Sequence, residues 1–252
     1  MTAAHPTRPT RVLPDGCMDI LVDFVAATSR VVGVMTKPLV TAQARIDLLG
    51  VRFLPGEAFA FLELRGDEGR DQNIDLEELW GSAGLRVPAL LAERPAADRV
   101  SALEALLLAR LDRSRAADHR LRAAVALLRA AEGRLSVAEV RAHVGLGERQ
   151  LERLFLERVG IGPKALARVL RLQALVARLD RPRTRAPHRG LGLGDLAADL
   201  GYADQAHLVR DVRALAGVTP TELARERAVT VSFNPSDAPR ATVAGERNED
   251  SP

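Results

Sequence analysis

Residues 145–163 read GLGERQLERLFLERVGIGP, and residues 201–220 read GYADQAHLVRDVRALAGVTP. The second stretch repeats the first, because leucine, arginine, glycine and proline recur at a constant offset of 57 residues from Leu151 and Leu208 onward. Two copies are too few for a solenoid, which needs about three repeats to bury a continuous core. The C-terminal half of the chain is therefore predicted to contain one structural unit built twice.

The first copy predicts two short helices separated by a tight turn. Ser136 and Glu139 have the spacing of a capping box, which opens a helix over residues 137–144. Gly145 ends this helix, since glycine tolerates the positive φ of a sharp turn. Residues 148–159 are predicted to form the second helix.

This second helix has an apolar face and a basic face. Leucine, phenylalanine and valine recur at helical spacing along one side. The opposite side carries Arg149, Glu152, Arg153 and Leu156. A glycine turn before a short basic helix is typical of a helix-turn-helix module, and two such modules indicate DNA as the partner.

The second copy predicts the same arrangement, with helices over residues 195–200 and 205–216, a turn at Gly201 and an N-cap at Asp204. A longer helix, over residues 163–180, joins the two copies. It is followed by a segment rich in proline, arginine and glycine, residues 181–190, which we interpret as a loop. The outward face of the last helix is expected to carry Gln205, Ala206, Val209, Arg210 and Arg213.

The positive charge lies where the repeat lies. Residues 113–228 hold 22 basic and 13 acidic side chains, whereas residues 1–112 hold 12 basic and 16 acidic side chains. A basic surplus confined to one domain is typical of a surface that attracts phosphate, although a solvated surface or an RNA-binding face would have the same composition. Only Lys37 and Lys164 are lysines, and the arginine bias is equally typical of a GC-rich genome.

Composition excludes several classes of protein. No stretch is apolar over the roughly eighteen residues that a membrane span requires, and the first eleven residues lack the apolar core of a signal peptide. Cys17 is the only cysteine, so the chain has no internal disulfide and no multi-cysteine metal site. We therefore expect a cytoplasmic protein that does not bind a membrane.

The N-terminal part is predicted to be a small α/β, β-rich domain. Runs rich in β-branched and apolar residues predict strands over residues 18–24 and 46–53, with a weaker candidate over 30–34. Short helices are predicted over residues 57–64 and 75–80. Amphipathic helices over residues 96–111 and 116–131 lead into the repeat.

The predicted fold class is mainly α, with a C-terminal all-α double helix-turn-helix domain. The expected boundaries are residues 1–95 for an N-terminal regulatory or dimerisation domain, 96–115 for a connecting helix, 116–228 for the DNA-binding domain and 229–252 for a disordered tail.

No catalytic residue, metal site or cofactor is predicted. Cys17 lies between Asp15 and Asp19 without a histidine nearby in sequence, which favours a small buried residue over a reactive thiol. The five histidines lack metal-ligand spacing. The glycines of residues 190–194 lack the Lys-Ser/Thr of a phosphate loop.

The two repeated stretches closely resemble the DNA-binding domain of AraC/XylS-type bacterial transcription regulators, over residues 121–227. Residues 11–19 and 50–56 are similar to the N-terminal domain of one branch of that family, whose first strands this chain is expected to lack. The resemblance implies a non-enzymatic, sequence-specific transcription regulator. Its two recognition helices would enter successive major grooves of double-stranded promoter DNA.

By this resemblance, the residues that face DNA are Arg149, Glu152 and Arg153 in the first unit and Gln205, Ala206, His207 and Arg210 in the second. Three departures from the family pattern are visible. Gly147 stands where a capping serine is usual, Val212 replaces the aromatic residue that Phe155 supplies in the first copy, and Ala206 cannot donate a hydrogen bond to a base.

The chemistry of these side chains suggests different roles. Arg149 and Arg210 are expected to read bases, since arginine to guanine O6 and N7 is the commonest specific contact. Arg153 is expected to hold a phosphate. Glu152 either accepts a hydrogen bond from cytosine N4 or pairs with Arg149 along the helix, and we favour the pairing.

Two alternative functions stay open at this stage. The repeat could be a DNA-binding module attached to an enzymatic, DNA-repair-like N-terminal domain, or the chain could be a constitutive DNA binder whose N-terminal domain only dimerises. A small-molecule effector and a second copy of the chain are open as further partners. An enclosed pocket with convergent polar groups in the N-terminal domain would favour a sensor.

Overall fold

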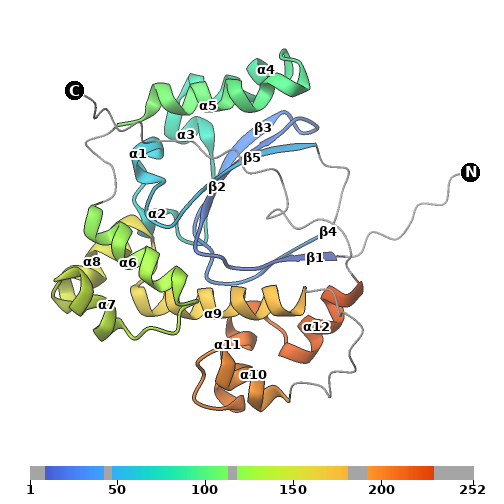
Figure 1. Cartoon of the computed structure of the whole chain (residues 1–252). Coiled ribbons are helices and arrows are strands. Elements are labelled where there is room, and N and C mark those ends of the chain that lie inside the picture. The colour runs from blue at the N-terminus through green and yellow to red at the C-terminus, as the bar shows by residue number, and fades with distance from the viewer. Residues whose placement is uncertain (1–8, 43–46, 113–117, 181–191, 230–252) are drawn as a thin grey trace, which may run out of the picture.

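The structure, a computed structural model, describes residues 9–42, 47–112, 118–180 and 192–229. Figure 1 shows a twisted sheet with helices above it and a long helix, α9 (Pro163–Leu179), crossing below it. The remaining C-terminal helices cluster at one end of α9 and beneath it.

The main sheet has four antiparallel strands, in the order β5 (Leu48–Phe53), β2 (Met18–Asp23), β3 (Thr28–Val32) and β6 (Asn73–Asp75). Side chains of β2 alternate, with Met18, Ile20 and Val22 buried. This period of two is the pattern of a strand with one face in the core. A separate antiparallel ribbon pairs β1 (Pro9–Val12) with β4 (Leu39–Ala42).

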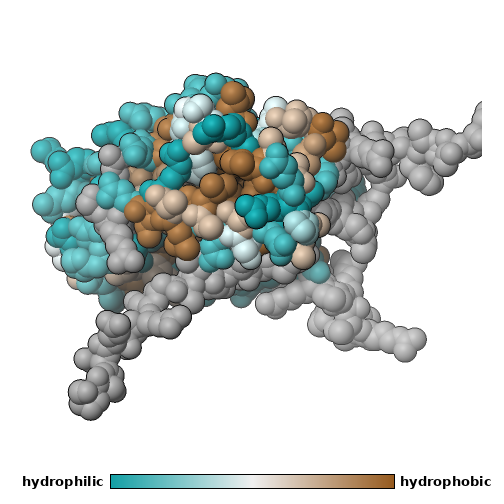
Figure 2. Space-filling view, turned by 90° about the horizontal axis from the view of Figure 1, so that it is seen from above, coloured by the Kyte–Doolittle hydropathy of each residue, from teal (hydrophilic) through white to brown (hydrophobic). Residues whose placement is uncertain are grey.

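Helices α3 (Leu76–Trp80) and α4 (Ser82–Ala92) pack against the sheet, and α5 (Arg99–Arg110) packs against α4. Trp80, Val87, Leu91 and Leu103 fill the space between them. Figure 2, which looks onto this end of the molecule, shows apolar side chains among polar ones, and the exposed apolar residues of α4 and α5 are Leu85, Leu90, Val100 and Leu108.

The C-terminal part consists of helices α6 (His119–Ala130), α7 (Val137–Val144), α8 (Glu148–Arg158), α9, α10 (Leu193–Asp199), α11 (Gln205–Ala216) and α12 (Pro220–Val229). Helix α9 contacts α6, α8, α11 and α12. Its apolar stripe includes Leu166, Leu172 and Leu175, each fully buried. The fold class predicted from the sequence, mainly α with a small β-rich N-terminal part, is confirmed.

Several N-terminal elements differ from their predictions. The helix predicted over residues 57–64 is only the four-residue α1 (Phe59–Leu62), because Glu63 adopts a left-handed φ of 57° and ends it. Strands β1, β4 and β6, the short helix α2 (Gly66–Gly69) and α4 were not predicted. Helix α4 contains Pro88, which reads as a helix breaker in the sequence.

Other predictions are left untested. The predicted loop over residues 181–190 lies outside the described residues, as does the predicted tail apart from Val229, which ends α12. The domain boundaries stay predictions. Helix α5, in the predicted connecting segment, packs against α1 and α4.

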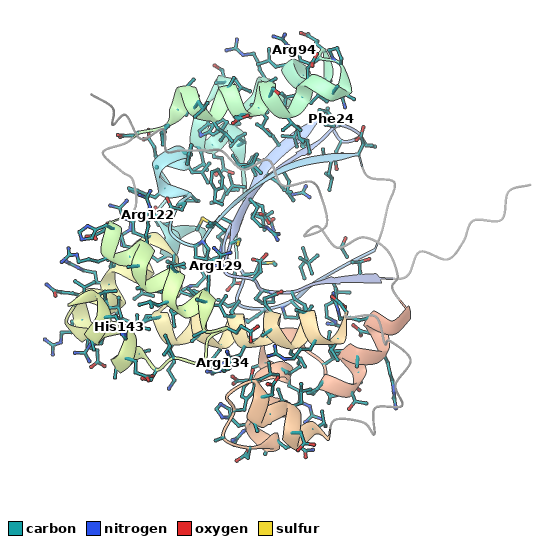
Figure 3. All side chains as sticks on the ribbon, viewed as in Figure 1. Phe24, Arg94, Arg122, Arg129, Arg134 and His143 are labelled. Atoms are coloured by element: carbon teal, nitrogen blue, oxygen red, sulfur yellow. The ribbon has the colours of Figure 1, made fainter. Side chains whose placement is uncertain are left out.

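The N-terminal part and the C-terminal helices share one hydrophobic core. The loop before β2 docks on α9, where Gln173 Nε2 donates to the carbonyl oxygen of Pro14 at 2.6 Å. An ion pair of 2.8 Å joins Glu57 to Arg122 of α6, which Figure 3 labels. At Gly66 and Gly160 the two backbones meet, since a Cβ on Gly66 would lie 2.3 Å from the Gly160 nitrogen.

This backbone contact predicts the effect of adding one methyl group. Gly66→Ala should force α2 away from Gly160 and lower the free energy of unfolding by about 1–3 kcal/mol, as overpacking does. Gly194→Ala is the matched control, because no atom beyond its chain neighbours and the backbone of its own helix lies within 4 Å of its Cβ position. Thermal unfolding of the two variants measures the difference, and a Gly66→Ala chain as stable as the control would contradict the contact.

Candidate nucleic-acid interface

A capping box positions the first unit, as the sequence predicts. The Glu139 amide donates to Ser136 Oγ at 3.2 Å, and the Ser136 amide donates to Glu139 Oε2 at 2.7 Å. Hydrogen bonds from the Ser136 hydroxyl and amide lower the pKa of the Glu139 carboxyl. Gly145, with a φ of 65°, ends α7 and turns the chain toward α8.

Helix α8 begins without a capping side chain, because its N-cap is Gly147. The Gln150 side chain compensates in part, since its Oε1 accepts from the Gly147 amide at 3.2 Å. Glu148 lies in the first turn, where a helix dipole favours a carboxylate, and it pairs with Arg141 at 3.2 Å. Half of a capping box therefore replaces the serine of the family pattern.

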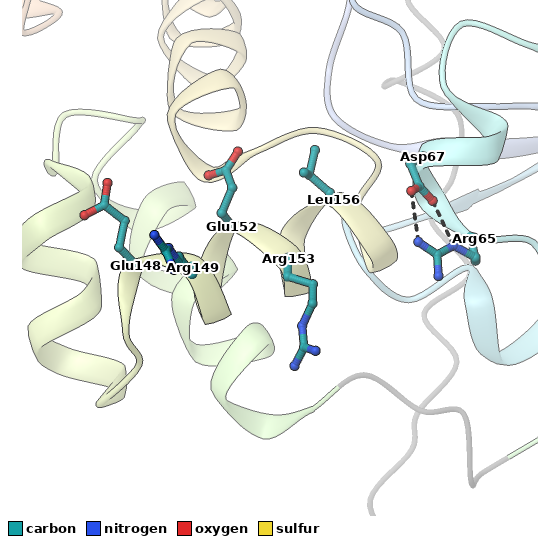
Figure 4. A pocket seen from close by; sticks show the side chains of 7 residues that line it. All are labelled: Arg65, Asp67, Glu148, Arg149, Glu152, Arg153 and Leu156. Carbon is teal, nitrogen blue, oxygen red and sulfur yellow. Dashed lines mark hydrogen bonds and ion pairs between the residues drawn. The ribbon is translucent and has the colours of Figure 1, made fainter.

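The two faces of α8 lie as predicted. Leu151 and Phe155 are fully buried, whereas Arg149, Glu152 and Arg153 are exposed. This outward face forms one wall of an open groove of about 660 Å³. The groove, which Figure 4 shows from close by, is lined by Arg65, Asp67, Glu148, Arg149, Glu152, Arg153 and Leu156.

The groove contains as many carboxylates as guanidinium groups, but they differ in their partners. Asp67 is paired with Arg65 and Glu148 with Arg141. Arg149 and Arg153 make no hydrogen bond or ion pair with any described residue. Two exposed arginines on α8 are therefore available to an anionic partner.

Glu152 lies close to the start of α9. Its Oε1 is so near Gly162, the N-cap of α9, that a Cβ on that glycine would lie 2.3 Å away. In Figure 4 its side chain points toward α9, whereas Arg153 points away from it. No ion pair joins Glu152 to Arg149 within the described part of the chain, so the pairing that we favoured from the sequence is absent. The carboxylate instead lies where the α9 dipole attracts it.

The second unit repeats this plan with a longer turn. Gly201 has a φ of 74°, and the Tyr202 amide donates to the Ala197 carbonyl oxygen at 2.9 Å. Asp204 caps α11, as predicted, because its Oδ1 accepts from the His207 amide at 2.6 Å. One more residue separates glycine from N-cap here than in the first unit, which is why the offset of 57 begins only after the turn.

On α11 the predicted residues fall into two groups. Gln205, Ala206 and Arg210 are exposed, and Arg210 has no hydrogen bond or ion pair among the described residues. His207 is half-buried: its ring lies edge-on to Tyr202 at 5.2 Å, and its Nε2 lies 4.0 Å from Asp211. His207 is therefore anchored to the body of the unit, whereas Arg210 is free.

Asp211 is a buried residue that the sequence reasoning missed. Its carboxylate lies 3.0 Å from Arg168 and 3.8 Å from Arg171, both on α9. Arg171 also lies over the Tyr202 ring at 5.0 Å. The signal that could have revealed it is an acidic residue on the inward side of α11 together with two arginines three positions apart on α9. The cluster fixes the rotation of α11 on α9.

The aromatic residue missing at Val212 lies elsewhere in the second unit. The first unit has Leu146 after its turn glycine and Phe155 in its helix, whereas the second has Tyr202 after the glycine and Val212 in the helix. All of these side chains are buried, and Val212 is fully so. The large and small residues have thus exchanged positions.

This exchange predicts that Val212→Phe overpacks the second unit and lowers the free energy of unfolding by about 1–3 kcal/mol. Tyr202→Leu in the same chain gives this unit the leucine and phenylalanine pair of the first, and should recover part of the loss. Thermal unfolding compares the single and double variants. An unchanged midpoint for Val212→Phe would indicate unfilled volume at this site.

Outside the groove, we considered the Cys17 thiol, clusters of metal-ligating side chains and membrane-spanning helices among the described residues. Burial, together with the carboxylate of Asp15, raises the pKa of the Cys17 thiol, so that it stays protonated. Within residues 9–42, 47–112, 118–180 and 192–229, no three His, Cys, Asp or Glu side chains gather as metal ligands would. None of the helices in these ranges combines the length and the apolar character needed to cross a membrane.

Two family models match separate parts of the chain. Residues 141–226, which include both units, match the model of a helix-turn-helix domain family. Residues 1–75 match a domain of unknown function (DUF6597). The C-terminal domain is therefore a helix-turn-helix domain, as its resemblance to AraC-type regulators predicts.

Solved structures are similar to parts of the chain. One is a transcriptional regulator from Chromobacterium violaceum, of the AraC-type DNA-binding domain-containing proteins, whose sequence is 28% identical to this chain. The match covers 44% of this chain and 94% of that protein, with a TM-score of 0.38. Two structures of ToxT from Vibrio cholerae are each 11% identical and cover 87% of this chain, and 95% and 94% of their own, with TM-scores of 0.41 and 0.45. No curated protein sequence matches the chain.

The exposed arginines of the helix-turn-helix domain that lack partners among the described residues are predicted to contribute most to DNA affinity. Arg149→Ala and Arg210→Ala should each weaken binding to a DNA duplex obtained by in vitro selection, here called the selected duplex, by about 1–3 kcal/mol. Both variants should stay folded, because the two side chains are exposed. Arg86→Ala, which removes an exposed charge from α4, is the control. If both variants bound the selected duplex as the control does, these helices would not be the readers.

Proposed function

We propose that this chain is a DNA-binding transcription regulator that inserts α8 and α11 into two successive major grooves on one face of promoter DNA. The observation that carries the proposal is that both helices pack on α9. Their outward faces carry arginines that have no hydrogen bond or ion pair among the described residues. Helix α9 has 17 residues, which corresponds to about 25 Å at 1.5 Å per residue. Successive major grooves on one face repeat about every 34 Å.

The two helices present different chemistry to the DNA. We propose that Arg149 and Arg210 read guanine edges and that Arg153 holds a phosphate. Gln205 can read adenine, and Ala206 can contact a thymine methyl group. Because the two sets differ, one chain should recognise an asymmetric site made of two unlike half-sites.

In this proposal, Glu152 and His207 affect binding through where they lie beside the DNA more than through strong contacts of their own. Glu152 near the start of α9 is expected to limit which base can approach Arg149 rather than to supply a strong contact of its own. His207 can donate to the DNA from its exposed edge while Tyr202 holds its ring. Both roles are weaker than those of the free arginines.

We further propose that the N-terminal domain modulates binding through its direct contacts with α8 and α9. The contacts at Gly66 and Gly160 and between Pro14 and Gln173 support this route. The groove beside α8 does not identify an effector site inside the sheet domain. The small-molecule effector, the homodimer and the cytoplasmic location stay predictions.

No observation favours an enzymatic N-terminal domain. A thiolate is the nucleophilic form of cysteine, and the raised pKa of Cys17 keeps that form rare. We therefore propose a regulator without catalytic activity.

Inserting about five base pairs between the half-sites tests the paired mode of binding. The insertion turns one half-site to the opposite face of the duplex, and α9 cannot follow without breaking its packing against α8 and α11. Affinity of the full chain should fall steeply, and an insertion of ten base pairs controls for length by restoring the face. Undiminished binding to the half-turn duplex would mean that only one unit touches the DNA.

A further inference from the structure

We infer that the N-terminal domain contributes its own DNA contact, in which Arg65 binds a phosphate of the duplex that α8 reads. This inference rests on the proposed function, because it requires α8 to lie in a major groove. The observation behind it is that Arg65 lines the same groove as Arg149 and Arg153, although it is 84 residues from Arg149 in the sequence.

The position of Arg65 relative to α8 is fixed. Arg65 is the residue directly before α2, and α2 packs against α8. The next residue, Gly66, makes the backbone contact with Gly160, two residues after α8 ends. In Figure 4, Arg65 lies beyond Leu156, off the C-terminal end of α8. The guanidinium is exposed, so a partner can reach it.

A group in this position meets backbone rather than bases. A helix with its side chains is about 10–12 Å across, and the major groove is about 12 Å wide, so α8 fills the groove by itself. A straight helix leaves the curved groove at its ends, so a side chain off the end of α8 faces the phosphate strands that border the groove. Arginine suits this role, because its guanidinium can donate two parallel hydrogen bonds to one phosphate.

Asp67 holds Arg65 when DNA is absent. Nε and Nη2 of Arg65 donate to the two oxygens of Asp67 at 3.1 and 3.0 Å, and Glu68 lies 3.8 Å away. The hydrogen bonds from Arg65 lower the pKa of the Asp67 carboxyl. An exposed pair of this kind contributes little stability, so a phosphate can displace the carboxylate. Asp67 thus competes with DNA for Arg65.

The test measures the affinity of the full chain and its dependence on salt, for a random-sequence duplex and for a duplex obtained by in vitro selection. Arg65→Ala should weaken both complexes by a similar factor and reduce the slope of log affinity against log salt by about 0.9, the value for one phosphate. Asp67→Asn should strengthen both complexes, because the competing charge is gone. Arg65→Lys should retain most of the salt slope.

Arg70→Ala is the matched control, since it removes one exposed arginine from the other end of α2 without touching the groove. Equal effects of Arg65→Ala and Arg70→Ala would overturn the inference, because net charge alone would explain them. Arg149→Ala distinguishes a failure of this inference from a failure of the proposed function. Weaker binding by Arg149→Ala with no change for Arg65→Ala and Asp67→Asn would refute this inference alone, whereas no change for any of the three would refute the proposed function as well.

Discussion

The apolar stripe of α9 is the constraint on which the rest of the structure depends. Leu166, Leu172 and Leu175 are fully buried within a core that both helix-turn-helix units and the N-terminal sheet share. Each side chain of this size contributes about 1.5–3 kcal/mol when it is buried. Because α8 and α11 pack on this one helix, their separation and relative rotation are set by packing.

Polar contacts divide the arginines of the C-terminal domain into two groups. Arg168 and Arg171 face the buried Asp211, and Arg178 is held by Glu132 and Asp199. Burying Asp211 without these partners would cost several kcal/mol, so the cluster specifies one rotation of α11. Arg149, Arg153 and Arg210 lack such partners among the described residues. The arginines that build the domain are thus distinct from those that are free to bind an anion.

The sequence predicts those helices whose ends are marked by capping residues or a turn glycine. Helices α7 and α11 match their predicted bounds, because Ser136 and Asp204 supply caps and Gly145 marks a turn. It does not predict contacts between distant segments. Gly66 and Gly160 each suggest a tight backbone, but neither indicates that the two touch, and Asp211 reads as a solvated acid until Arg168 is placed beside it. The face of α8 was predictable, whereas the groove wall at Arg65 was not.

The close contact between the domains restricts how a signal could alter DNA binding. Gly66 and Gly160 meet at the backbone, so no side chain is available to absorb a displacement of α2. A shift of the N-terminal sheet must therefore move α8 or separate the two glycines. The loop at Pro14 is joined to α9 by the hydrogen bond from Gln173, and α11 packs on the same helix. Regulation by small changes in the angle between the two recognition helices requires only this shared support, because interfaces packed to native density shift as units rather than deform.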